Sequence, residues 1–448
     1  MRIIIIGAGT TGKNLAGRLC SVGHDVIIVD NNPETLANID SEIDVLAVEG
    51  DGSTPAVLQE AEVAKADLVA AVTSRDEVNI LACCWAHNAG VEHTIARISD
   101  KSYIESPFAD LEKIGVDHAV SQHEHCAQEI FNVFCLPGTI EVANLLGGRL
   151  AAVGFKVPAA SPLLDKPLRE FGEEPWFRKV RFIAHAHHQE LDIPRGDSCC
   201  AEGDALYVVL NPDEASPFLN WALGGPIPGF RKVVIVGGSD LGLALVELLE
   251  TSSFETILIE RDSDRAYYIS EKTNNCMVVN ADATKAAVLK EFGMDSGTAV
   301  AALTDDDEMN IVCCMQAKQL GVGSTIARID KPEYVPIIDN FEIVERVVSP
   351  YLSLIREILR CVHGASVINV GLFHRISGEL QEVAIMPRSK WIDKRLSKAR
   401  LPNDMIIAAV QRHNEIFVPT GDFVFQENDL LAVYCLQKTA YKVRSIFK

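Results

Sequence analysis

The chain has 448 residues, too many for one ordinary hydrophobic core, so its length favours two to four domains. Its 62 acidic and 41 basic residues give a formal net charge of −21, which argues against electrostatic docking to nucleic acids or anionic lipids. The 12 cysteines occur singly or as adjacent pairs and never as CxxC, which indicates a reduced, cytosolic compartment.

The N-terminus enters an apolar strand directly, without a basic segment or a cleavage site. No stretch approaches the roughly 18 to 20 uninterrupted apolar residues that a membrane span requires. We therefore expect a soluble, cytoplasmic protein, and any role at a membrane must come through a protein partner.

The first 100 residues alternate short apolar runs with segments of helical periodicity. The helical segments are 11–23 and 77–90, and the apolar runs are 3–7, 25–30, 44–51, 66–73 and 93–98. Fully apolar strands separated by helices are typical of βαβ units on a parallel sheet that is covered on both faces. The sequence therefore predicts a Rossmann-like α/β domain.

An amphipathic segment, residues 127–138, follows this domain and leads into a region with a different pattern of apolar and turn residues. Residues 181–197 show short strands around turn residues, and another strand is predicted at 203–209. The pattern predicts a small α+β domain. The amphipathic segment suits an interface between domains, although a helix that faces a core has the same pattern.

The second half of the chain repeats the first at an offset of 230 or 231. The pairs are Gly7 with Gly237, Asp30 with Glu260, Asp51 with Asp282, Thr73 with Thr304, Asn79 with Asn310 and Arg97 with Arg328. The later segments 352–364, 406–422 and 428–434 repeat the amphipathic segment and the small region. A period this long indicates duplicated domains rather than a solenoid.

We therefore expect four domains in the order N1, C1, N2, C2. Their ranges are 1–125 for N1, 126–215 for a linking helix with C1, 231–350 for N2, and 351–448 for a linking helix with C2. The Pro- and Gly-rich residues 216–230 are the expected central linker.

A glycine-rich turn, Gly7-Ala8-Gly9-Thr10-Thr11-Gly12, stands between the first strand and the first helix. The first glycine permits the tight turn, the second lets the backbone approach a pyrophosphate, and the third lets the helix pack close to the strand. Asp30 closes the second strand, where it can accept hydrogen bonds from an adenosine ribose and disfavours a 2′-phosphate. The pattern predicts NAD(H) binding; the alternative is a tight strand–helix corner without a ligand.

The second copy of this turn departs from the pattern. Ser239 replaces the central glycine, and Asp240 adds negative charge beside it, while Glu260 keeps the acidic ribose position. We expect weakened or altered nucleotide binding in N2, or a purely structural sheet.

Further polar residues follow the later strands of N1. Asp51 and Gly52 follow the third strand, Thr73 and Ser74 follow the fourth, and Arg97 in the fifth is the one cation expected to meet a phosphate. Thr73 and Asp76 also suit helix N-caps, and their recurrence in N2 leaves a binding role and a capping role equally open.

Over essentially its whole length the chain resembles the TrkA family, the regulatory subunits of Trk-type potassium uptake systems, which are built from two RCK (KTN) domains that are each followed by a TrkA-C domain. The resemblance rests on GxGxxG with Asp30, the G-D-G-S turn at 50–53, T-x-x-D-E-x-N twice, A-R-I twice, and the P-x-G-D turns at 194–197 and 419–422.

The resemblance implies NAD(H) binding, with ATP or ADP as further ligands, in a ring of RCK domains beneath a membrane-embedded potassium translocation subunit of the TrkH or TrkG type. The nucleotide state would alter the gate of that subunit. The implied binding positions in N1 are Gly7, Ala8, Gly9, Thr10, Thr11, Gly12, Asp30, Asp51, Gly52, Thr73, Ser74 and Arg97, and those in N2 are Glu260, Asp282, Thr304 and Arg328. The Ser239-Asp240 departure leaves the ligand of N2 open.

A nicotinamide dehydrogenase is the alternative from another class. It needs an acid–base side chain beside the reacting carbon and a domain that presents the substrate. His24, His87 and His93 do not recur in the second copy, and C1 and C2 carry no charged cluster that resembles a substrate clamp. We therefore expect a regulator and not an enzyme, although its client could be another cation channel or exchanger.

His185, His187 and His188 raise the question of a metal site, because the first two project from one face of a strand. Aligned by eye, the second copy carries Ala409, Gln411 and Arg412 in their places, and no zinc spacing supports a metal. We expect a solvated strand face and no metal. Residues 195–197 spell Arg-Gly-Asp, which is expected to be a turn, and a small ligand of C1 and C2 stays an open question.

Overall fold

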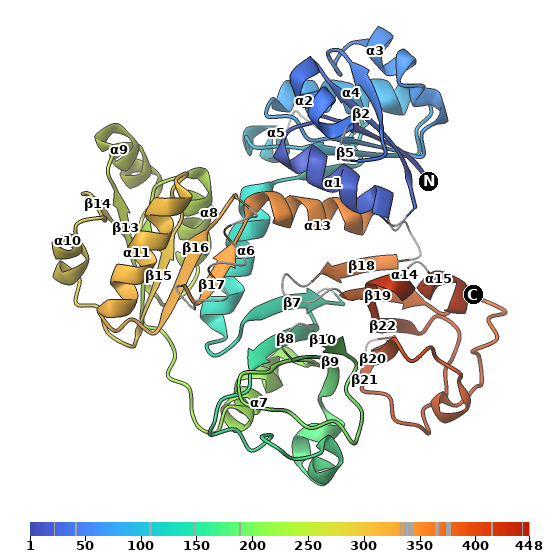
Figure 1. Ribbon diagram of the computed structural model, residues 1–448, viewed down its shortest axis with the longest axis vertical. Coiled ribbons are helices and arrows are strands. Elements are labelled where there is room, and N and C mark those ends of the chain that lie inside the picture. The colour runs from blue at the N-terminus through green and yellow to red at the C-terminus, as the bar shows by residue number, and fades with distance from the viewer. Residues whose placement is uncertain are drawn as a thin grey trace. The chain divides into compact units, whose positions relative to one another are not determined.

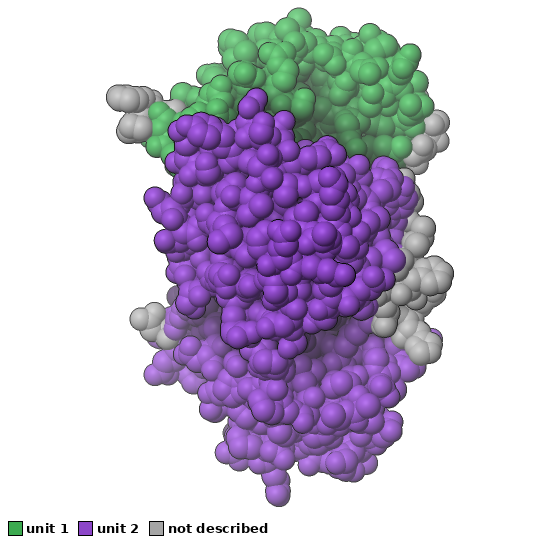
Figure 2. Space-filling view, turned by 90° about the vertical axis from the view of Figure 1, so that its left-hand side faces the viewer, with its two compact units in different colours: residues 1–126, 349–362 green, residues 127–348, 363–448 purple. Residues whose placement is uncertain are grey.

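The computed structural model (Figure 1) divides into two compact units, residues 1–126 with 349–362 and residues 127–348 with 363–448 (Figure 2). It describes all residues except 22, 41–42, 107–109, 147, 188–189, 332–333, 335–337, 339–343, 363–366, 373–377, 414, 441 and 448. Within the described ranges, none of the helices has the length and apolar character that crossing a bilayer would need.

The first unit is built on a six-stranded parallel sheet in the order β3-β2-β1-β4-β5-β6. Its strands are β1 (Arg2–Ile6), β2 (Asp25–Asp30), β3 (Leu46–Glu49), β4 (Leu68–Ala71), β5 (His93–Arg97) and β6 (His118–Val120). The strand order reverses between β1 and β4. At such a switch point the connections leave in opposite directions, which opens a crevice at the carboxyl edge of the sheet.

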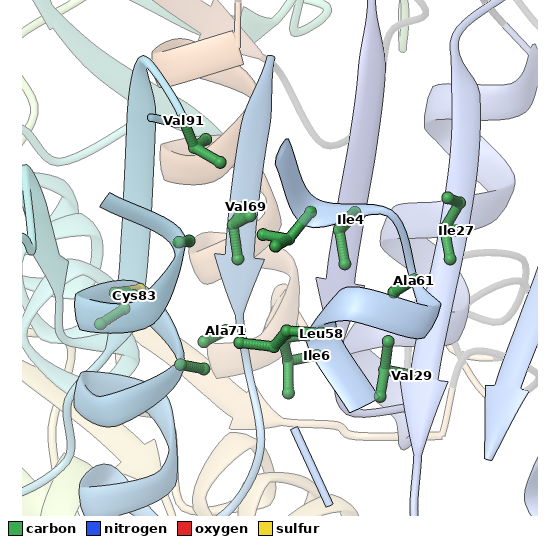
Figure 3. Packing of buried hydrophobic residues seen from close by; sticks show 14 of the residues in the cluster. Ile4, Ile6, Ile27, Val29, Leu58, Ala61, Val69, Ala71, Cys83 and Val91 are labelled. Atoms are coloured by element: carbon green, nitrogen blue, oxygen red, sulfur yellow. The ribbon is translucent and has the colours of Figure 1, made fainter. Parts of the chain in front are cut away.

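Helices cover this sheet because its strands are apolar on both faces. They are α1 (Thr10–Ser21), α2 (Pro33–Asp40), α3 (Pro55–Glu60), α4 (Asp76–Asn88) and α5 (Ser102–Glu105). On one face, Ile4, Ile27 and Val69 pack with Leu58 of α3 and Cys83 of α4 (Figure 3). These side chains are almost fully buried, so the sheet rests on a dry core.

A helix from much later in the chain, α13 (Pro350–Val362), belongs to this unit and contacts α1, β5 and β6. It follows N2 in sequence but packs on N1. The preceding linking helix, α6 (Gln122–Cys135), begins in the first unit and continues into the second, where Phe134 meets Phe230 edge to face with 6.2 Å between the ring centroids.

N2 repeats the sheet of N1 with the order β14-β13-β12-β15-β16-β17, again all parallel. Its strands are β12 (Lys232–Val236), β13 (Glu255–Glu260), β14 (Cys276–Asn280), β15 (Thr298–Ala302), β16 (Ser324–Arg328) and β17 (Arg346–Val348). Its helices include α8 (Asp240–Leu249), α9 (Ser263–Lys272), α10 (Ala286–Glu291) and α11 (Asp307–Gln319). The two Rossmann-like domains predicted from the repeat are confirmed.

C1 and C2 are five-stranded antiparallel sheets with matching strand orders, β10-β9-β11-β8-β7 and β21-β20-β22-β19-β18. C1 includes β7 (Glu141–Leu145), β8 (Leu150–Lys156), β9 (Arg181–His187), β10 (Glu190–Asp192), β11 (Ala205–Leu210) and α7 (Pro212–Ala222). C2 includes β18 (Val367–Leu372), β19 (Gly378–Ala384), β20 (Met405–Arg412), β21 (Glu415–Phe417), β22 (Leu430–Leu436), α14 (Gln437–Ala440) and α15 (Val443–Phe447). The shared order shows that the duplication includes the small domains.

C1 and C2 share a hydrophobic core to which Tyr207 and Tyr434 both contribute. The fully buried Glu382 of C2 accepts a hydrogen bond of 2.6 Å from the backbone N–H of Leu146 in C1. Arg181 donates across the same interface to the Pro419 carbonyl at 2.6 Å. A buried acceptor that is paired with the other domain makes this interface specific as well as apolar.

One sequence expectation is wrong, the extent of the central linker. Residues 216–222 form the last part of α7, although the Pro and Gly content of 216–230 as a whole predicts a linker. Pro217 is accommodated within the helix, while Phe218, Leu219 and Ala222 anchor it in the core of C1. Burial of this apolar face outweighs the proline, so only residues 223–230 connect C1 to N2.

Candidate functional site

A cleft of about 400 Å³ lies at the carboxyl edge of the N1 sheet, at the switch point between β1 and β4. Its lining brings together the ends of five strands that are up to 91 positions apart in the sequence, since it extends from Ile6 to Arg97. It is lined by Ile6, Gly7, Gly9, Thr10, Thr11, Val29, Asp30, Asn31, Gly50, Asp51, Gly52, Val72, Thr73, Ser74, Arg75, Val78 and Arg97.

The three glycines of the turn have three different physical roles. Gly7 has a φ of +105°, which a residue with a Cβ rarely adopts. A Cβ on Gly12 would lie 1.8 Å from the carbonyl oxygen of Gly7, so only glycine lets α1 approach the strand end. A Cβ on Gly9 would have nothing within 4 Å. Gly9 therefore faces open space, where the backbone is accessible to a ligand.

Asp30 fastens the glycine turn to the end of β2. Its carboxylate accepts hydrogen bonds from the backbone N–H of Ala8 at 2.6 Å and from that of Asn32 at 2.8 Å, one at each oxygen. Each carboxylate oxygen can accept a second hydrogen bond. Asp30 can therefore hold the turn and still receive two hydroxyl groups from the cleft.

Asp51 shapes the loop after β3 at the rim of the cleft. Its carboxylate accepts from the Ser53 hydroxyl at 2.7 Å and from the Ser53 N–H at 2.9 Å, and these hydrogen bonds lower the pKa of Asp51. A Cβ on Gly52 would lie 2.2 Å from a methyl group of Ile6, so the loop lies directly on the sheet edge. Asp282 makes the matching contacts with Thr284 in N2.

Thr73 is held by Asn79, which is fully buried. The Asn79 side-chain oxygen accepts from the Thr73 N–H at 2.9 Å and from its hydroxyl at 2.7 Å, while its amide donates to the carbonyls of Thr73 and Arg97. Asn79 thus joins the ends of β4 and β5. Asn310 makes the same four contacts in N2.

Asp76 does not cap its own helix. Its carboxylate accepts from the backbone N–H groups of Ser99 and Asp100, at 2.9 and 2.8 Å, and so ties the start of α4 to the chain after β5. For Asp76, the structure therefore shows hydrogen bonds that connect two loops in place of the helix cap that the sequence left open. Asp307 makes the equivalent hydrogen bonds in N2.

Arg97 is the side chain whose environment differs most between the two copies. Its Nε atom is buried and has no hydrogen-bond partner among the described residues. Burial lowers the pKa of Arg97, and the charge of Asp76 offsets this only in part. A half-buried guanidinium that lines a cleft is a strong site for an anion, because hydrogen bonds to the anion replace the hydrogen bonds to water that burial removed.

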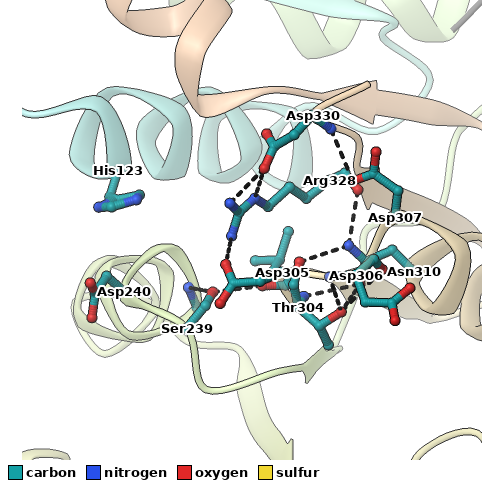
Figure 4. Close-up of polar contacts among 12 residues, drawn as sticks. His123, Ser239, Asp240, Thr304, Asp305, Asp306, Asp307, Asn310, Arg328 and Asp330 are labelled. Atoms are coloured by element: carbon teal, nitrogen blue, oxygen red, sulfur yellow. Dashed lines mark hydrogen bonds and ion pairs between the residues drawn. The ribbon is translucent and has the colours of Figure 1, made fainter. Parts of the chain in front are cut away.

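In N2 the equivalent Arg328 is already paired (Figure 4). It donates to Asp330 at 2.6 and 3.0 Å and also forms an ion pair with Asp305. Burial by itself would lower the pKa of Arg328, but these two carboxylates outweigh it and raise the pKa. Ser74 and Ser99 occupy the corresponding positions in N1, so these two positions supply Arg97 with no carboxylate, and its Nε has no partner among the residues that the structure describes.

The glycine turn of N2 is closed by its own side chains. The Ser239 hydroxyl donates to the Leu303 carbonyl at 2.6 Å and accepts from the Gly242 N–H at 3.2 Å, as a helix N-cap does. Asp240 forms an ion pair with Arg265 at 2.8 Å. A carboxylate already stands at the helix N-terminus, where N1 offers room for a phosphate.

Sequence reasoning missed three features of the site. It named Arg97 as the one cation, but Arg75 also lines the cleft. It noted the recurrence of Asn79 without its role, and it did not notice that Asp305 and Asp330 neutralise Arg328. The substitution of two serines by two aspartates between the copies was the available signal.

The glycine turn yields a stability prediction for two adjacent glycines. Gly12→Ala should destabilise N1 by roughly 3 kcal/mol or more, because its Cβ would overlap a carbonyl oxygen. Gly9→Ala should change stability by less than about 0.5 kcal/mol, because its Cβ meets no atom. Denaturant unfolding of the two purified variants measures the difference, and equal stabilities would contradict this description of the turn.

The comparisons with known proteins agree with this geometry. The TrkA-N domain family matches residues 3–122 and 233–350, and the TrkA-C domain family matches residues 380–448. Among solved structures, the GsuK channel bound to NAD aligns with a TM-score of 0.63 at 21% identity over 98% of this chain and 78% of that chain. The GsuK RCK domain aligns with a TM-score of 0.61 at 19% identity, covering 100% and 94% of the two chains. These likenesses show the RCK fold.

Curated relatives match over the full length. A Trk system potassium uptake protein TrkA from Haemophilus influenzae is 30% identical over 98% of this chain and 96% of its own. A TrkA homologue from Methanosarcina mazei is 29% identical over 100% of both chains. With two TrkA-N domains, a TrkA-C domain and full-length relatives, the chain belongs to the TrkA family of Trk-system potassium uptake proteins.

Proposed function

We propose that the chain is a nucleotide-sensing regulatory subunit of a Trk-type potassium uptake system, and that N1 binds NAD(H). The observation that carries the proposal is the cleft of N1, which has Asp30 as a hydroxyl acceptor, the unpaired Nε of Arg97 as an anion site, and an open glycine turn between their strands. An adenine dinucleotide offers hydroxyl groups and a pyrophosphate in that combination.

The four-domain division given above is part of this proposal, with the nucleotide held by the first domain. In N1 the pyrophosphate would lie on the backbone from Gly7 to Gly12, and the ribose would lie against Asp30. Asp51, Gly52, Thr73 and Ser74 form the rim, with Arg97 opposite the phosphates. ATP and ADP share the ribose and the phosphates, so they are expected to compete for the same cleft.

We propose a weaker or altered nucleotide site in N2. Glu260 provides an acidic side chain at the expected ribose position. Its carboxylate accepts a hydrogen bond of 2.6 Å from the Gly238 N–H, as that of Asp30 does from the Ala8 N–H. Asp282 and Thr304 keep their loop geometry. Phosphate binding, however, would have to displace Asp305 and Asp330 from Arg328, which costs ion-pair energy that N1 does not lose.

The nucleotide is proposed to be a regulatory ligand and not a redox substrate. None of the described residues that line the cleft is His, Lys, Tyr or Cys, which are side chains that commonly transfer protons beside a nicotinamide. Asp51 has a lowered pKa, so it is a poor general acid at neutral pH. Such a cleft can bind a dinucleotide and convert its affinity into a change of conformation.

The partner is proposed to be a membrane-embedded potassium translocation subunit of the TrkH or TrkG type. The chain would act at the cytoplasmic face of the membrane, held there by that subunit, within a homo-oligomeric ring of RCK domains. Support comes from the full-length relatives, which are named as potassium uptake proteins. Two unequal nucleotide sites in each chain would let the ring combine several increments of binding energy at one gate.

The first prediction tests the ribose position. Asp30→Asn should weaken NADH binding by roughly 10- to 100-fold, because hydrogen bonds to a charged acceptor contribute about 1.5–3 kcal/mol. Calorimetric titration with NADH measures the change, and the recovered cofactor should be chemically unchanged. Glu260→Gln is the matched control in N2 and should leave the tight site intact. Unchanged affinity in Asp30→Asn, or sustained turnover of the cofactor, would contradict the proposal.

The second prediction exchanges the neighbours of the arginine between the copies. Ser74→Asp with Ser99→Asp should give Arg97 the environment of Arg328 and weaken NADH binding at least about tenfold, because the anion site is then filled internally. Asp305→Ser with Asp330→Ser is the reverse exchange and should leave N1 affinity unchanged. If the double aspartate variant binds NADH normally, Arg97 is not the phosphate site.

The third prediction concerns the client. The tagged chain, used to capture partners from solubilised native membranes, should recover a potassium translocation subunit identified by mass spectrometry. The Ser74→Asp and Ser99→Asp variant, captured in parallel, should show whether docking requires nucleotide in the N1 cleft. Specific recovery of another cation channel or exchanger would identify a different client for the same nucleotide sensor.

A further inference from the structure

A cluster of two histidines and an aspartate lies in C1, outside the nucleotide clefts. His185 and His187 project from one face of β9, and Asp204 immediately precedes the neighbouring strand β11. The nearest donor atoms of the three side chains all lie within 4.8 Å of one another. His188, which the sequence placed beside them, lies outside the described residues.

The carboxylate at the centre of the cluster is buried. Asp204 is 4% exposed and His185 is 8% exposed, while His187 reaches the surface. His185 Nε2 lies 2.7 Å from one Asp204 oxygen, and His187 Nδ1 contacts the other. Burial by itself would raise the pKa of Asp204, but hydrogen bonds from His185, the Ala201 N–H and His187 outweigh it and lower the pKa. A buried carboxylate needs hydrogen-bonding or cationic partners, and here two imidazoles lie against it.

C2 shows how the same position is neutralised without histidine. The strand pairing aligns Ala205 with Leu430 and Ala186 with Gln411, so Arg412 stands at the position of His187. This corrects the alignment by eye, which had placed Gln411 there. Arg412 donates two hydrogen bonds of 2.8 Å to Asp429, the equivalent of Asp204. C2 thus fills the position with a permanent cation.

C1 has imidazoles in place of that guanidinium, and imidazoles are ligands for transition metals. The surrounding strands add a supporting group. Asp192 on β10 pairs in register with His185, and its carboxylate lies 3.5 Å from His185 Nδ1, the ring nitrogen that faces away from Asp204. A carboxylate on the far nitrogen of a histidine fixes the tautomer and orients the other nitrogen toward a metal.

We propose that His185, His187 and Asp204 form a binding site for a divalent first-row transition metal, with zinc as the favoured ion, and that Asp192 orients His185. Two imidazoles and one carboxylate are a common zinc ligand set, completed by water. Zinc ligands at roughly 2.1 Å from the ion lie about 3.4 Å apart. The contacts of Asp204 with the two histidines are shorter than this, so modest side-chain rotations would admit the ion. The expectation of a solvated strand face without a metal is thereby replaced by this proposal.

The test uses the full chain, stripped of metal with a chelator and titrated with Zn²⁺ against a competing chromogenic chelator. The wild-type chain should bind one Zn²⁺ per chain at this site, and Co²⁺ should give the visible absorption of an ion with nitrogen and oxygen ligands. Asp192→Asn should weaken zinc binding by about 10- to 100-fold, as expected for loss of a supporting carboxylate. His187→Ala should weaken it further.

His187→Arg is the decisive variant, because it reproduces the Arg412–Asp429 pair of C2 at this position. It should keep C1 folded, as judged by circular dichroism and thermal unfolding, and should abolish metal binding at this site. His413→Gln, in the corresponding hairpin of C2, is the matched control and should bind zinc normally. The proposal is overturned if the stripped wild-type chain takes up no Zn²⁺ or Co²⁺, or if His187→Arg binds them as tightly as the wild type.

Discussion

A half-buried arginine at the end of the fifth strand is the constraint on which the candidate site depends. A guanidinium that has lost part of its hydration is stabilised by an anion, which replaces the lost hydrogen bonds to water. The fold places this group at the end of the fifth strand in both N domains. In N2, Asp305 and Asp330 supply the anion from within the domain. In N1 the corresponding residues are serines, so the cleft itself is where an anion can bind.

The two C domains also differ in how they pair a buried charge, which here is the negative charge of an aspartate. Asp429 in C2 is buried and is paired with an arginine, which keeps its charge at any physiological pH. Asp204 in C1 is buried to a similar degree and is paired with two histidines. In both kinds of domain, the second copy neutralises its buried charge with an oppositely charged internal partner. In the first copy, Asp204 is paired with two histidines, and the Nε of Arg97 has no hydrogen-bond partner among the described residues.

Duplication makes this division of roles possible without loss of the fold. The backbone features of the two N domains are nearly identical: Gly7 and Gly237 share a left-handed φ, and Asn79 and Asn310 make the same contacts. Because these features hold the sheet edge in shape, the residues around them can change. The exchange of serine for aspartate then alters the chemistry of the cleft while the architecture stays constant. The return of α13 to N1 places a helix that follows N2 on the nucleotide-binding domain proposed above.

The sequence by itself determined the Rossmann-like sheets, the duplication, the glycine turn and the acid at Asp30, because these depend on local patterns of apolar residues and glycines. It also indicated Arg97 as a candidate phosphate contact, because a charged residue at the end of an apolar strand can be recognised from the sequence. Only the tertiary structure decided that Arg328 is neutralised by Asp305 and Asp330, that residues 216–222 belong to α7, and that Asp204 meets His185 and His187. The physical reason is that hydration and pairing of a charge depend on neighbours brought together by strand pairing and core burial, and sequence spacing alone does not reveal which neighbours those are.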